Sequence, residues 1–181
     1  MTAEKTELEG CLILSPNTFT DHRGQFFESH NNQRFKDLTG LDIEFVQDNQ
    51  SVSAKGVLRG LHFQMGNFEQ AKLVRVISGR IQDVCVDIRP SSPTFGKYFS
   101  IVLDSINNKQ LFIPRGFAHG FLVLEDNTIV SYKCDNYYNK DAEGGIIFDD
   151  KTLSINWQVP TSEAILSSKD KLLPSFESQF I

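Results

Sequence analysis

The sequence has few cysteines, no long apolar run and no excess of positive charge, and each shortage excludes a class of protein. Its three cysteines, Cys11, Cys85 and Cys134, lack the close spacing of a zinc site, and their odd number argues against a disulfide framework. A net charge of -5 argues against a general nucleic-acid-binding surface. No apolar stretch approaches the length that spans a membrane.

The first ten residues, MTAEKTELEG, contain no apolar segment of the kind found in a secretory signal. We therefore expect a cytoplasmic protein with no membrane contact and no nucleic-acid partner. Of the 181 residues, 40% are hydrophobic and 15 are Phe, which is enough for a substantial core. No repeat, linker or low-complexity segment divides the chain, so a single domain over residues 1–181 is expected.

Short β-rich runs separated by turn residues occupy most of the chain, which predicts an all-β, antiparallel barrel or sandwich. Gly79, between two β-branched runs, predicts a hairpin turn. One helix is expected at Asn31–Leu38, with Asn31 as its cap and Gly40 as its terminator. The tail from Thr161 to Ile181 is expected to form short helical or irregular structure. The expected strands are Cys11–Leu14, Gln25–Ser29, Phe45–Ser53, Val57–Gln64, Leu73–Ser78, Ile81–Ile88, Lys97–Leu103, Gln110–Ile113, Gly120–Leu124 and Ile129–Cys134.

Polar residues recur on one face of several expected strands. Gln47 and Asn49 share a face of one strand, and Asp83, Cys85 and Asp87 share a face of another. In an ordinary antiparallel sheet such a row faces water. In a barrel with a polar interior it surrounds a small ligand. The pattern alone leaves both destinations open.

Two imidazoles are expected inside the barrel. His119 follows the turn Pro114-Arg115-Gly116, and His62 lies in the run Leu58–Gln64. The two segments resemble the paired motifs of cupins, which are jelly-roll β-barrels. Metal-binding cupins have His-x-His in the first motif, whereas this chain has Gln64 at the second position, so no metal site is expected. Histidines free of metal can move protons, although a histidine taken alone is more often a core residue bonded to a carbonyl group.

Positively charged residues among apolar neighbours are candidates for binding an anion. Arg23 and Arg59 adjoin glycines, and the planar guanidinium group suits phosphate oxygens. The alternative is a structural salt bridge, for example of Arg23 with Asp21 or Glu28. Lys72 could stabilise an enolate oxygen as a fixed positive charge, or it could be a surface lysine.

Two further residues could take part in proton transfer. The Tyr132 phenol can act as a general acid, although tyrosines are common in strands for their β-propensity alone. Asp170 lies in the tail, where a carboxylate is ordinarily solvated. It matters to the chemistry only if the tail folds back and Asp170 holds the second nitrogen of His62, as the carboxylate of a catalytic triad does.

A series of motifs in order, from about Leu12 to Leu173, resembles the dTDP-4-dehydrorhamnose 3,5-epimerase family. The motifs are Phe19-x-Asp21-x-Arg23-Gly24-x-Phe26-x-Glu28, Phe45-Val46-Gln47-Asp48-Asn49-x-Ser51, Leu58-Arg59-Gly60-Leu61-His62-x-Gln64, Lys72-Leu73-Val74-Arg75-Val76, Asp83-Val84-x-Val86-Asp87-Ile88-Arg89, Ser92-Pro93-Thr94-Phe95-Gly96, Pro114-x-Gly116-Phe117-Ala118-His119-Gly120-Phe121, Tyr132-Lys133-Cys134 and Leu166-Ser167-x-Lys169-Asp170.

The resemblance implies a metal-free, cofactor-free cupin homodimer that acts on a dTDP-linked 4-keto-6-deoxy sugar in L-rhamnose precursor synthesis. It implies that His62 removes the protons beside the ketone, that Asp170 orients His62, that Lys72 stabilises the enolate and that Tyr132 returns a proton from the opposite face. The residues that it implies for substrate binding are Arg23, Phe26, Glu28, Gln47, Asn49, Arg59, His119 and Tyr138.

Three departures from the family pattern bear on the substrate. The segment Met65–Gln70 lacks a proline common in relatives, Asn139 replaces another, and Phe148 stands where Trp is usual. A mono-epimerase of a related sugar nucleotide is therefore an alternative. A metal-dependent cupin oxygenase or isomerase is a second, and a non-catalytic sugar-binding cupin, in which Lys72 and Tyr132 would have no evident use, is a third.

Overall fold

The computed structural model describes the backbone of residues 1–181 and every side chain except that of Thr161. Its strands are β1 (Thr2–Lys5), β2 (Leu12–Ser15), β3 (Thr18–Asp21), β4 (Gly24–Phe27), β5 (Gln47–Ser53), β6 (Leu58–Gln64), β7 (Lys72–Ser78), β8 (Arg80–Asp87), β9 (Tyr98–Asp104), β10 (Gln110–Ile113), β11 (Phe117–Val123), β12 (Thr128–Cys134) and β13 (Glu143–Gly145). The helices are α1 (Asn32–Thr39) and α2 (Phe176–Phe180), with short 3-10 turns η1 (Gly66–Phe68), η2 (Lys140–Ala142), η3 (Thr161–Glu163) and η4 (Asp170–Leu172).

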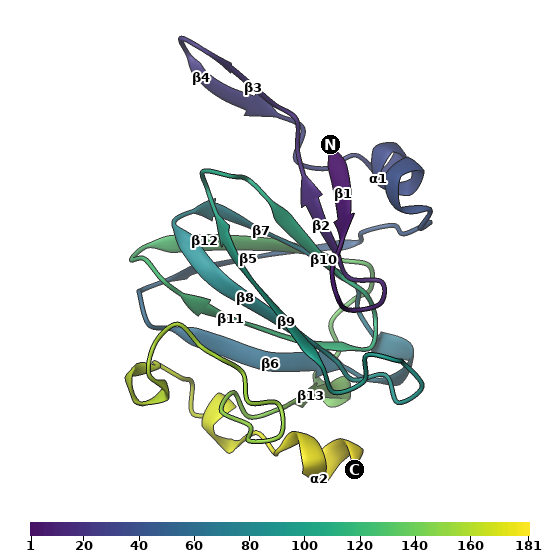
Figure 1. Ribbon diagram of the computed structural model, residues 1–181, viewed down its shortest axis with the longest axis vertical. Coiled ribbons are helices and arrows are strands. Elements are labelled where there is room, and N and C mark those ends of the chain that lie inside the picture. Colours follow the sequence, from purple (N-terminus) through teal and green to yellow (C-terminus); the bar gives the residue numbers. More distant parts are fainter.

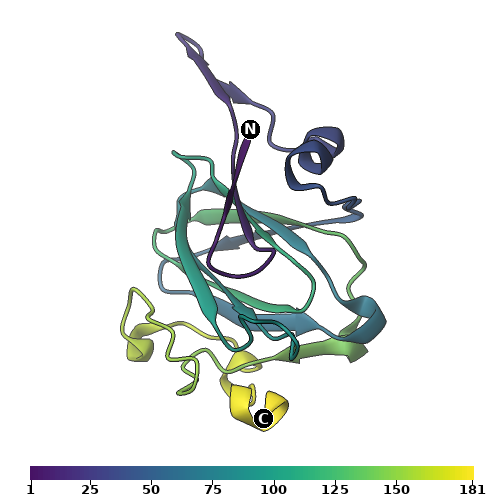
Figure 2. The same cartoon turned by 45° about the vertical axis from the view of Figure 1, so that its right-hand side comes forward.

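Two antiparallel sheets face each other and form the body of the protein (Figure 1). One sheet has the order β1-β2-β10-β7-β12-β5 and the other β13-β6-β11-β8-β9, while β3 and β4 form a separate hairpin. The C-terminal segments lie beyond the five-stranded sheet, at the end of the molecule opposite the hairpin, in both Figure 1 and Figure 2. The expected all-β fold with a few short helices is confirmed.

The alternation along β8 divides the core into two layers. Cys85 points between the sheets, where it packs with Val74 and Val130. Val84 and Val86 point to the other face and are covered by side chains of the C-terminal region. The tail is therefore packed against the outside of the five-stranded sheet, and this packing brings residues near position 170 close to β6.

The expected helix and its two caps are present. The Asn31 side chain accepts a hydrogen bond from the Arg34 amide at 3.1 Å, and Gly40 ends the helix in the left-handed region at φ 72°. Each of the ten expected strands has a counterpart, although β11 begins at Phe117 and not at Gly120. The sequence analysis missed β1, β3 and β13, because these strands are short and carry little apolar character.

Two glycines allow β6 and β11 to approach closely. Gly60 has φ +121°, and a Cβ atom at this position would lie 2.5 Å from the Gly120 Cα. The pairing of β6 with β11 shifts register between His119 and Phe121, next to this contact. On one side of the shift His62 lies opposite His119, so two imidazole-bearing positions face each other across adjacent strands.

The β3–β4 hairpin projects away from the two sheets (Figure 1). Phe19 and Phe26 are 66% and 72% exposed, which is unusual for side chains of this size. Near the turn, the Arg23 guanidinium group pairs with the Asp21 carboxylate at 2.5 Å, as the salt-bridge alternative expected.

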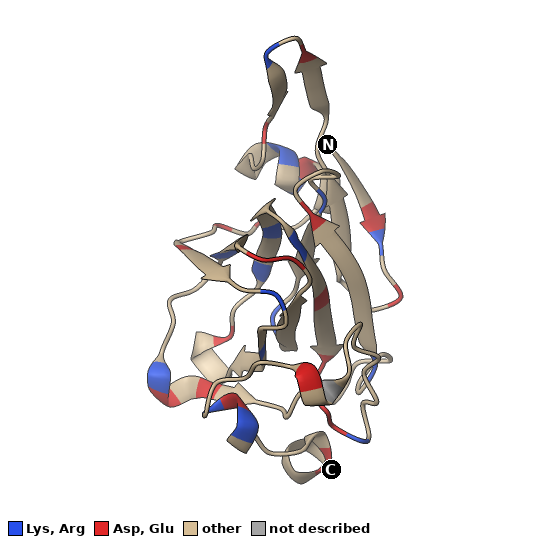
Figure 3. Cartoon of the chain, turned by 90° about the vertical axis from the view of Figure 1, so that its left-hand side faces the viewer, with Lys and Arg blue, Asp and Glu red and all other residues tan. Residues whose placement is uncertain are grey.

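Figure 3 shows Lys, Arg, Asp and Glu interspersed along the chain, the hairpin included. No helix among the described residues has the length and apolar character needed to cross a membrane.

Candidate active site

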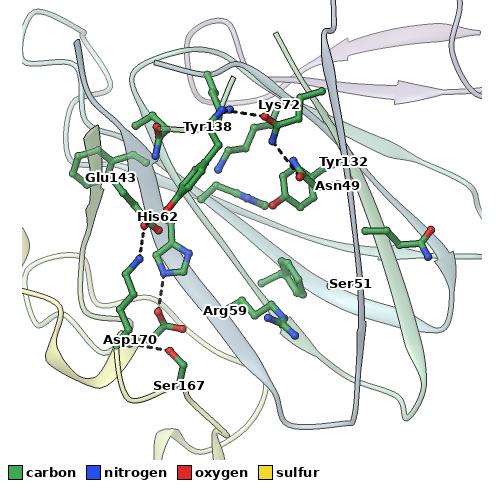
Figure 4. A pocket seen from close by; sticks show the side chains of 18 residues that line it. Asn49, Ser51, Arg59, His62, Lys72, Tyr132, Tyr138, Glu143, Ser167 and Asp170 are labelled. Carbon is green, nitrogen blue, oxygen red and sulfur yellow. Dashed lines mark hydrogen bonds and ion pairs between the residues drawn. The ribbon is translucent and has the colours of Figure 1, made fainter. Parts of the chain in front are cut away.

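A cavity of about 470 Å³ lies between the two sheets, and polar side chains from both sheets and from the tail line it (Figure 4). Nine of the twelve predicted site residues are among its lining residues. The lining residues are Gln47, Asn49, Gln50, Ser51, Arg59, His62, Phe63, Gln64, Gln70, Lys72, His119, Phe121, Tyr132, Tyr138, Glu143, Ser167, Lys169 and Asp170.

His62, on β6, contacts the tail through its imidazole ring. Its Nε2 atom lies 2.7 Å from Oδ1 of Asp170, which is buried, while the His62 side chain is 30% exposed. Burial lowers the pKa of His62, and the Asp170 carboxylate opposes that shift by bonding to the ring. Because Nε2 is engaged, Nδ1 is the nitrogen left to accept a proton. The expected contact between Asp170 and His62 is thus present.

Tyr132 and Lys72 lie on the other sheet, on the neighbouring strands β12 and β7. The Lys72 ammonium group is 5.9 Å from the centre of the Tyr132 ring. Burial raises the pKa of Tyr132, so its phenol stays protonated at neutral pH, and burial lowers the pKa of Lys72. His62 and Tyr132 therefore belong to opposite walls of the cavity (Figure 4).

Arg59 brings a positive charge to the cavity. Its Nε and Nη2 atoms donate to the Ser53 hydroxyl group at 3.3 and 3.2 Å. No carboxylate pairs with this guanidinium group among the described residues. An arginine held by a neutral hydroxyl group remains available to an anionic ligand such as phosphate.

Amide side chains hold the loop that carries Tyr138. The Gln47 side chain accepts from the Tyr138 amide at 3.0 Å and donates to Asn49 at 3.1 Å. Gln64 accepts from the Asn139 amide at 2.9 Å. The residue that replaces a cupin metal ligand therefore positions a loop at the rim of the cavity. Among the described residues, no cluster of three or more His, Cys, Asp or Glu side chains could hold a metal ion.

The sequence analysis missed Glu143, the residue that links the tail to this rim. Its carboxylate accepts from the Tyr138 hydroxyl group at 2.8 Å and pairs with the Lys169 ammonium group. These contacts lower the pKa of Glu143 against the raising effect of burial. Lys169 precedes Asp170 and lies within a motif quoted above, but no role was assigned to it. Glu143 is on β13, a strand with no clear sequence signal.

Three of the expected substrate-binding residues do not reach this cavity in the single chain. Arg23 and Phe26 are on the projecting hairpin, and Glu28 follows it, where its carboxylate pairs with Arg34 at 3.1 Å. In the single chain these three predicted residues therefore lie apart from the other nine. The reason is that β3 and β4 pair only with each other and leave the sheets.

Comparison with known proteins agrees with this geometry. Residues 5–178 match the family model described as dTDP-4-dehydrorhamnose 3,5-epimerase. The enzyme of that name from Shigella flexneri is 50% identical over 170 residues, which cover 94% of this chain and 93% of the relative. The crystal structure of the enzyme of that name from Elizabethkingia anophelis is 50% identical, with a TM-score of 0.95 over 100% of this chain and 99% of that one.

Two further structures contain ligands. An epimerase from Legionella pneumophila in complex with dTDP-4-keto-L-rhamnose is 42% identical, with a TM-score of 0.92 over 96% of this chain and 92% of that one. A 3'-monoepimerase from Streptomyces bikiniensis in complex with dTDP-quinovose is 32% identical, with a TM-score of 0.88 over 94% of this chain and 85% of that one. The family match and these identities confirm the predicted isomerase class. The chain belongs to the dTDP-4-dehydrorhamnose 3,5-epimerase family.

Proposed function

We propose that this protein converts dTDP-4-dehydro-6-deoxy-D-glucose to dTDP-4-dehydro-L-rhamnose by inverting carbons 3 and 5, in the synthesis of dTDP-L-rhamnose. The observation that carries the proposal is the arrangement of one base and one acid on opposite walls of a cavity. His62, bound to Asp170, lies on one sheet, and Tyr132 lies on the other. Removing a proton on one face of the sugar ring and returning one on the other inverts a carbon.

The ketone makes this chemistry accessible to an imidazole. It acidifies the C–H bonds on both flanking carbons, and the electron pair left by the proton moves onto the ketone oxygen. Nδ1 of His62 takes the proton, and Asp170 stabilises the resulting imidazolium through Nε2. Burial lowers the pKa of His62, so the ring is neutral and ready to act as a base at neutral pH.

The enolate oxygen needs a positive charge close to it. Lys72, which lines the cavity, supplies one, and its burial away from bulk water strengthens the effect. Tyr132 then delivers its phenolic proton to the opposite face. His62 releases its proton to solvent and Tyr132 takes one up from solvent, so both groups are restored before the second carbon reacts. The reaction is an exchange of protons and needs no redox cofactor. Arg59 binds the diphosphate, His119 contacts the sugar, and Gln47, Asn49 and Tyr138 contact the nucleotide.

Solvent exchange tests this proposal directly. In heavy water the sugar is expected to gain deuterium at both carbons that flank the ketone, and His62→Ala is expected to abolish the gain. A reductase coupled to the assay would report the L-sugar product. Incorporation at only one carbon would support the mono-epimerase alternative. The 50% identity to 3,5-epimerases, against 32% to a 3'-monoepimerase, favours inversion at both carbons.

The protein acts as a homodimer in this proposal, and the β3–β4 hairpin extends onto a second copy. A projecting hairpin with two exposed phenylalanines gains stability only when another surface covers it. In a symmetric dimer each hairpin is covered in the same way. Arg23, Phe26 and Glu28 would then complete the cavity of the partner, which would account for their distance from the cavity of their own chain.

Mixing two inactive variants tests this arrangement. When Arg23→Ala and His62→Ala subunits form a mixed dimer, hairpin exchange places both substitutions in one site and leaves the other site intact. About half of the mixed dimer's sites should then be active. Activity no higher than that of the separate variants, with mixed dimers verified by mass, would exclude the exchange. Light scattering on the unmodified protein should give twice the chain mass of 20.5 kDa.

We further propose a cytoplasmic location. All three cysteines are buried and free, and the sulfur atoms of Cys11 and Cys85 lie 3.7 Å apart without forming a disulfide bond. Free thiols at this separation suit a reducing compartment.

A further inference from the structure

A second carboxylate–imidazole pair lies at the wall of the cavity. Nε2 of His119, on β11, is 2.7 Å from Oδ1 of Asp83, on β8. Asp83 is 0% exposed and His119 is 5% exposed, yet the His119 ring lines the cavity. The pair is thus buried on the protein side and open on the ligand side.

The surroundings of Asp83 are unfavourable for a charged group. Its partners across the sheet are Phe121 and Ile101, both apolar. Its second carboxylate oxygen, Oδ2, has no hydrogen-bond partner among the described residues. Removing a carboxylate from water is energetically costly, and replacing a buried ion pair with apolar residues is often neutral or stabilising. Core packing alone therefore gives no reason for Asp83 to be present.

The contact between His119 and Asp83 has the same geometry as the contact between His62 and Asp170. His62 and His119 lie opposite each other on β6 and β11. Each binds a carboxylate oxygen through Nε2 at 2.7 Å, so in each ring Nδ1 is the nitrogen left for a ligand. A carboxylate on one nitrogen fixes both the orientation of an imidazole ring and its tautomer.

We propose that Asp83 is a positioning residue for the epimerase reaction. By accepting the Nε2–H of His119, it fixes the tautomer whose Nδ1 accepts a hydrogen bond from a hydroxyl group of the bound sugar. That contact aligns the ring carbons with His62. The inference depends on the proposed function, because it assumes a sugar in the cavity.

The test compares Asp83→Asn with the unmodified protein, after epimerisation by the latter has been shown. Asparagine keeps the shape of the side chain and removes its charge. We expect kcat to fall about 10- to 100-fold, since a small misplacement of the reacting atoms costs this much. Affinity for dTDP-glucose, which carries hydroxyl groups but no ketone, should fall about 2- to 10-fold, as for one lost hydrogen bond. Affinity for dTDP alone should stay within 2-fold.

Asp87→Asn is the matched control. Asp87 lies on the same strand and face and is also 0% exposed, but its carboxylate bonds to Arg89, Ser92 and Thr94 and does not line the cavity. The Asp87→Asn substitution should lower the melting temperature and leave kcat unchanged. If Asp83→Asn leaves kcat and dTDP-glucose affinity within 2-fold, or weakens dTDP binding equally, the positioning role is wrong.

Two further measurements test the proposal even if Asp83→Asn folds poorly. In the His119→Asn background, adding Asp83→Asn should change kcat by less than 2-fold, because Asp83 acts through His119. A fall in kcat as large as the one that Asp83→Asn causes in the unmodified protein would contradict the proposal. In the unmodified protein, nitrogen-15 NMR should show His119 protonated at Nε2, with the Nδ1 resonance shifting when dTDP-glucose binds. A ring protonated only at Nδ1 would also contradict it.

Discussion

Nε2 of His62 lies 2.7 Å from Oδ1 of Asp170, a contact that joins β6 to the tail across 108 positions of sequence. The tail reaches this point because Lys169 pairs with Glu143 and because the Phe176 amide donates to Asp150 at 2.8 Å. His62, the proposed base, is therefore oriented by a segment that is not part of either sheet.

Replacing Asp170 with Asn should lower kcat about 10²- to 10⁴-fold, because the imidazolium formed during proton removal loses its carboxylate. Binding of dTDP should change little. Lys171→Gln is the control, since this exposed neighbour does not line the cavity. Steady-state kinetics with the coupled reductase would measure both variants, and a kcat for Asp170→Asn within 3-fold of normal would remove Asp170 from the mechanism.

Tyr132→Phe separates proton removal from proton return. The base remains, so in heavy water the recovered, uninverted sugar should still gain deuterium as His62 returns the label to the same face. Epimerised product should form about 10²- to 10⁴-fold more slowly, because no acid is left on the opposite wall. NMR of the recovered sugar gives both rates. Inversion at the normal rate would show that another group supplies the proton.

The acid side of the pH profile should reflect His62. Burial lowers the pKa of this ring, so kcat/KM should stay high as the pH falls below the ordinary histidine range and decline only when His62 becomes protonated. Asp170 opposes the shift, so in Asp170→Asn the decline should move to still lower pH. His30→Gln, a substitution outside the cavity, should leave the pH of this decline unchanged. A decline above the ordinary histidine range would contradict burial as the dominant cause.

The strands could be predicted, together with the residues that share a face of each, because alternation along β5, β7, β8 and β12 is a local property of the sequence. Which of the two faces points inward could not be predicted from alternation alone. The same alternation placed Gln47 and Asn49 on one face, and both line the cavity. The contact between His62 and Asp170 was expected only through the family resemblance. No local pattern shows which carboxylate of the tail will fold back onto β6.

Other parts of the site depend on packing between segments far apart in the sequence. Glu143 lies on a three-residue strand, EGG, that exists because it pairs with β6. The separation of Arg23 from the cavity depends on where the hairpin leaves the sheets. Asp83 was recognised as part of a polar row, but its contact with His119 requires the register between β8 and β11.

Gly60→Ala should destabilise the protein through the contact between β6 and β11. The added Cβ would lie 2.5 Å from the Gly120 Cα and 2.8 Å from the His119 carbonyl oxygen, so the strands would have to separate. Gly24→Ala is the matched control, because Gly24 has nearly the same backbone angle, φ +123° against +121°, with no atom within 4 Å of its Cβ. Backbone strain alone costs about 1–3 kcal/mol, and overpacking adds about 1–3 kcal/mol. Denaturant unfolding should therefore show a larger loss for Gly60→Ala than for Gly24→Ala. Because His62 and His119 flank the contact, Gly60→Ala should also lower kcat. Equal losses of stability in Gly60→Ala and Gly24→Ala would mean that β6 and β11 are not held together at this point.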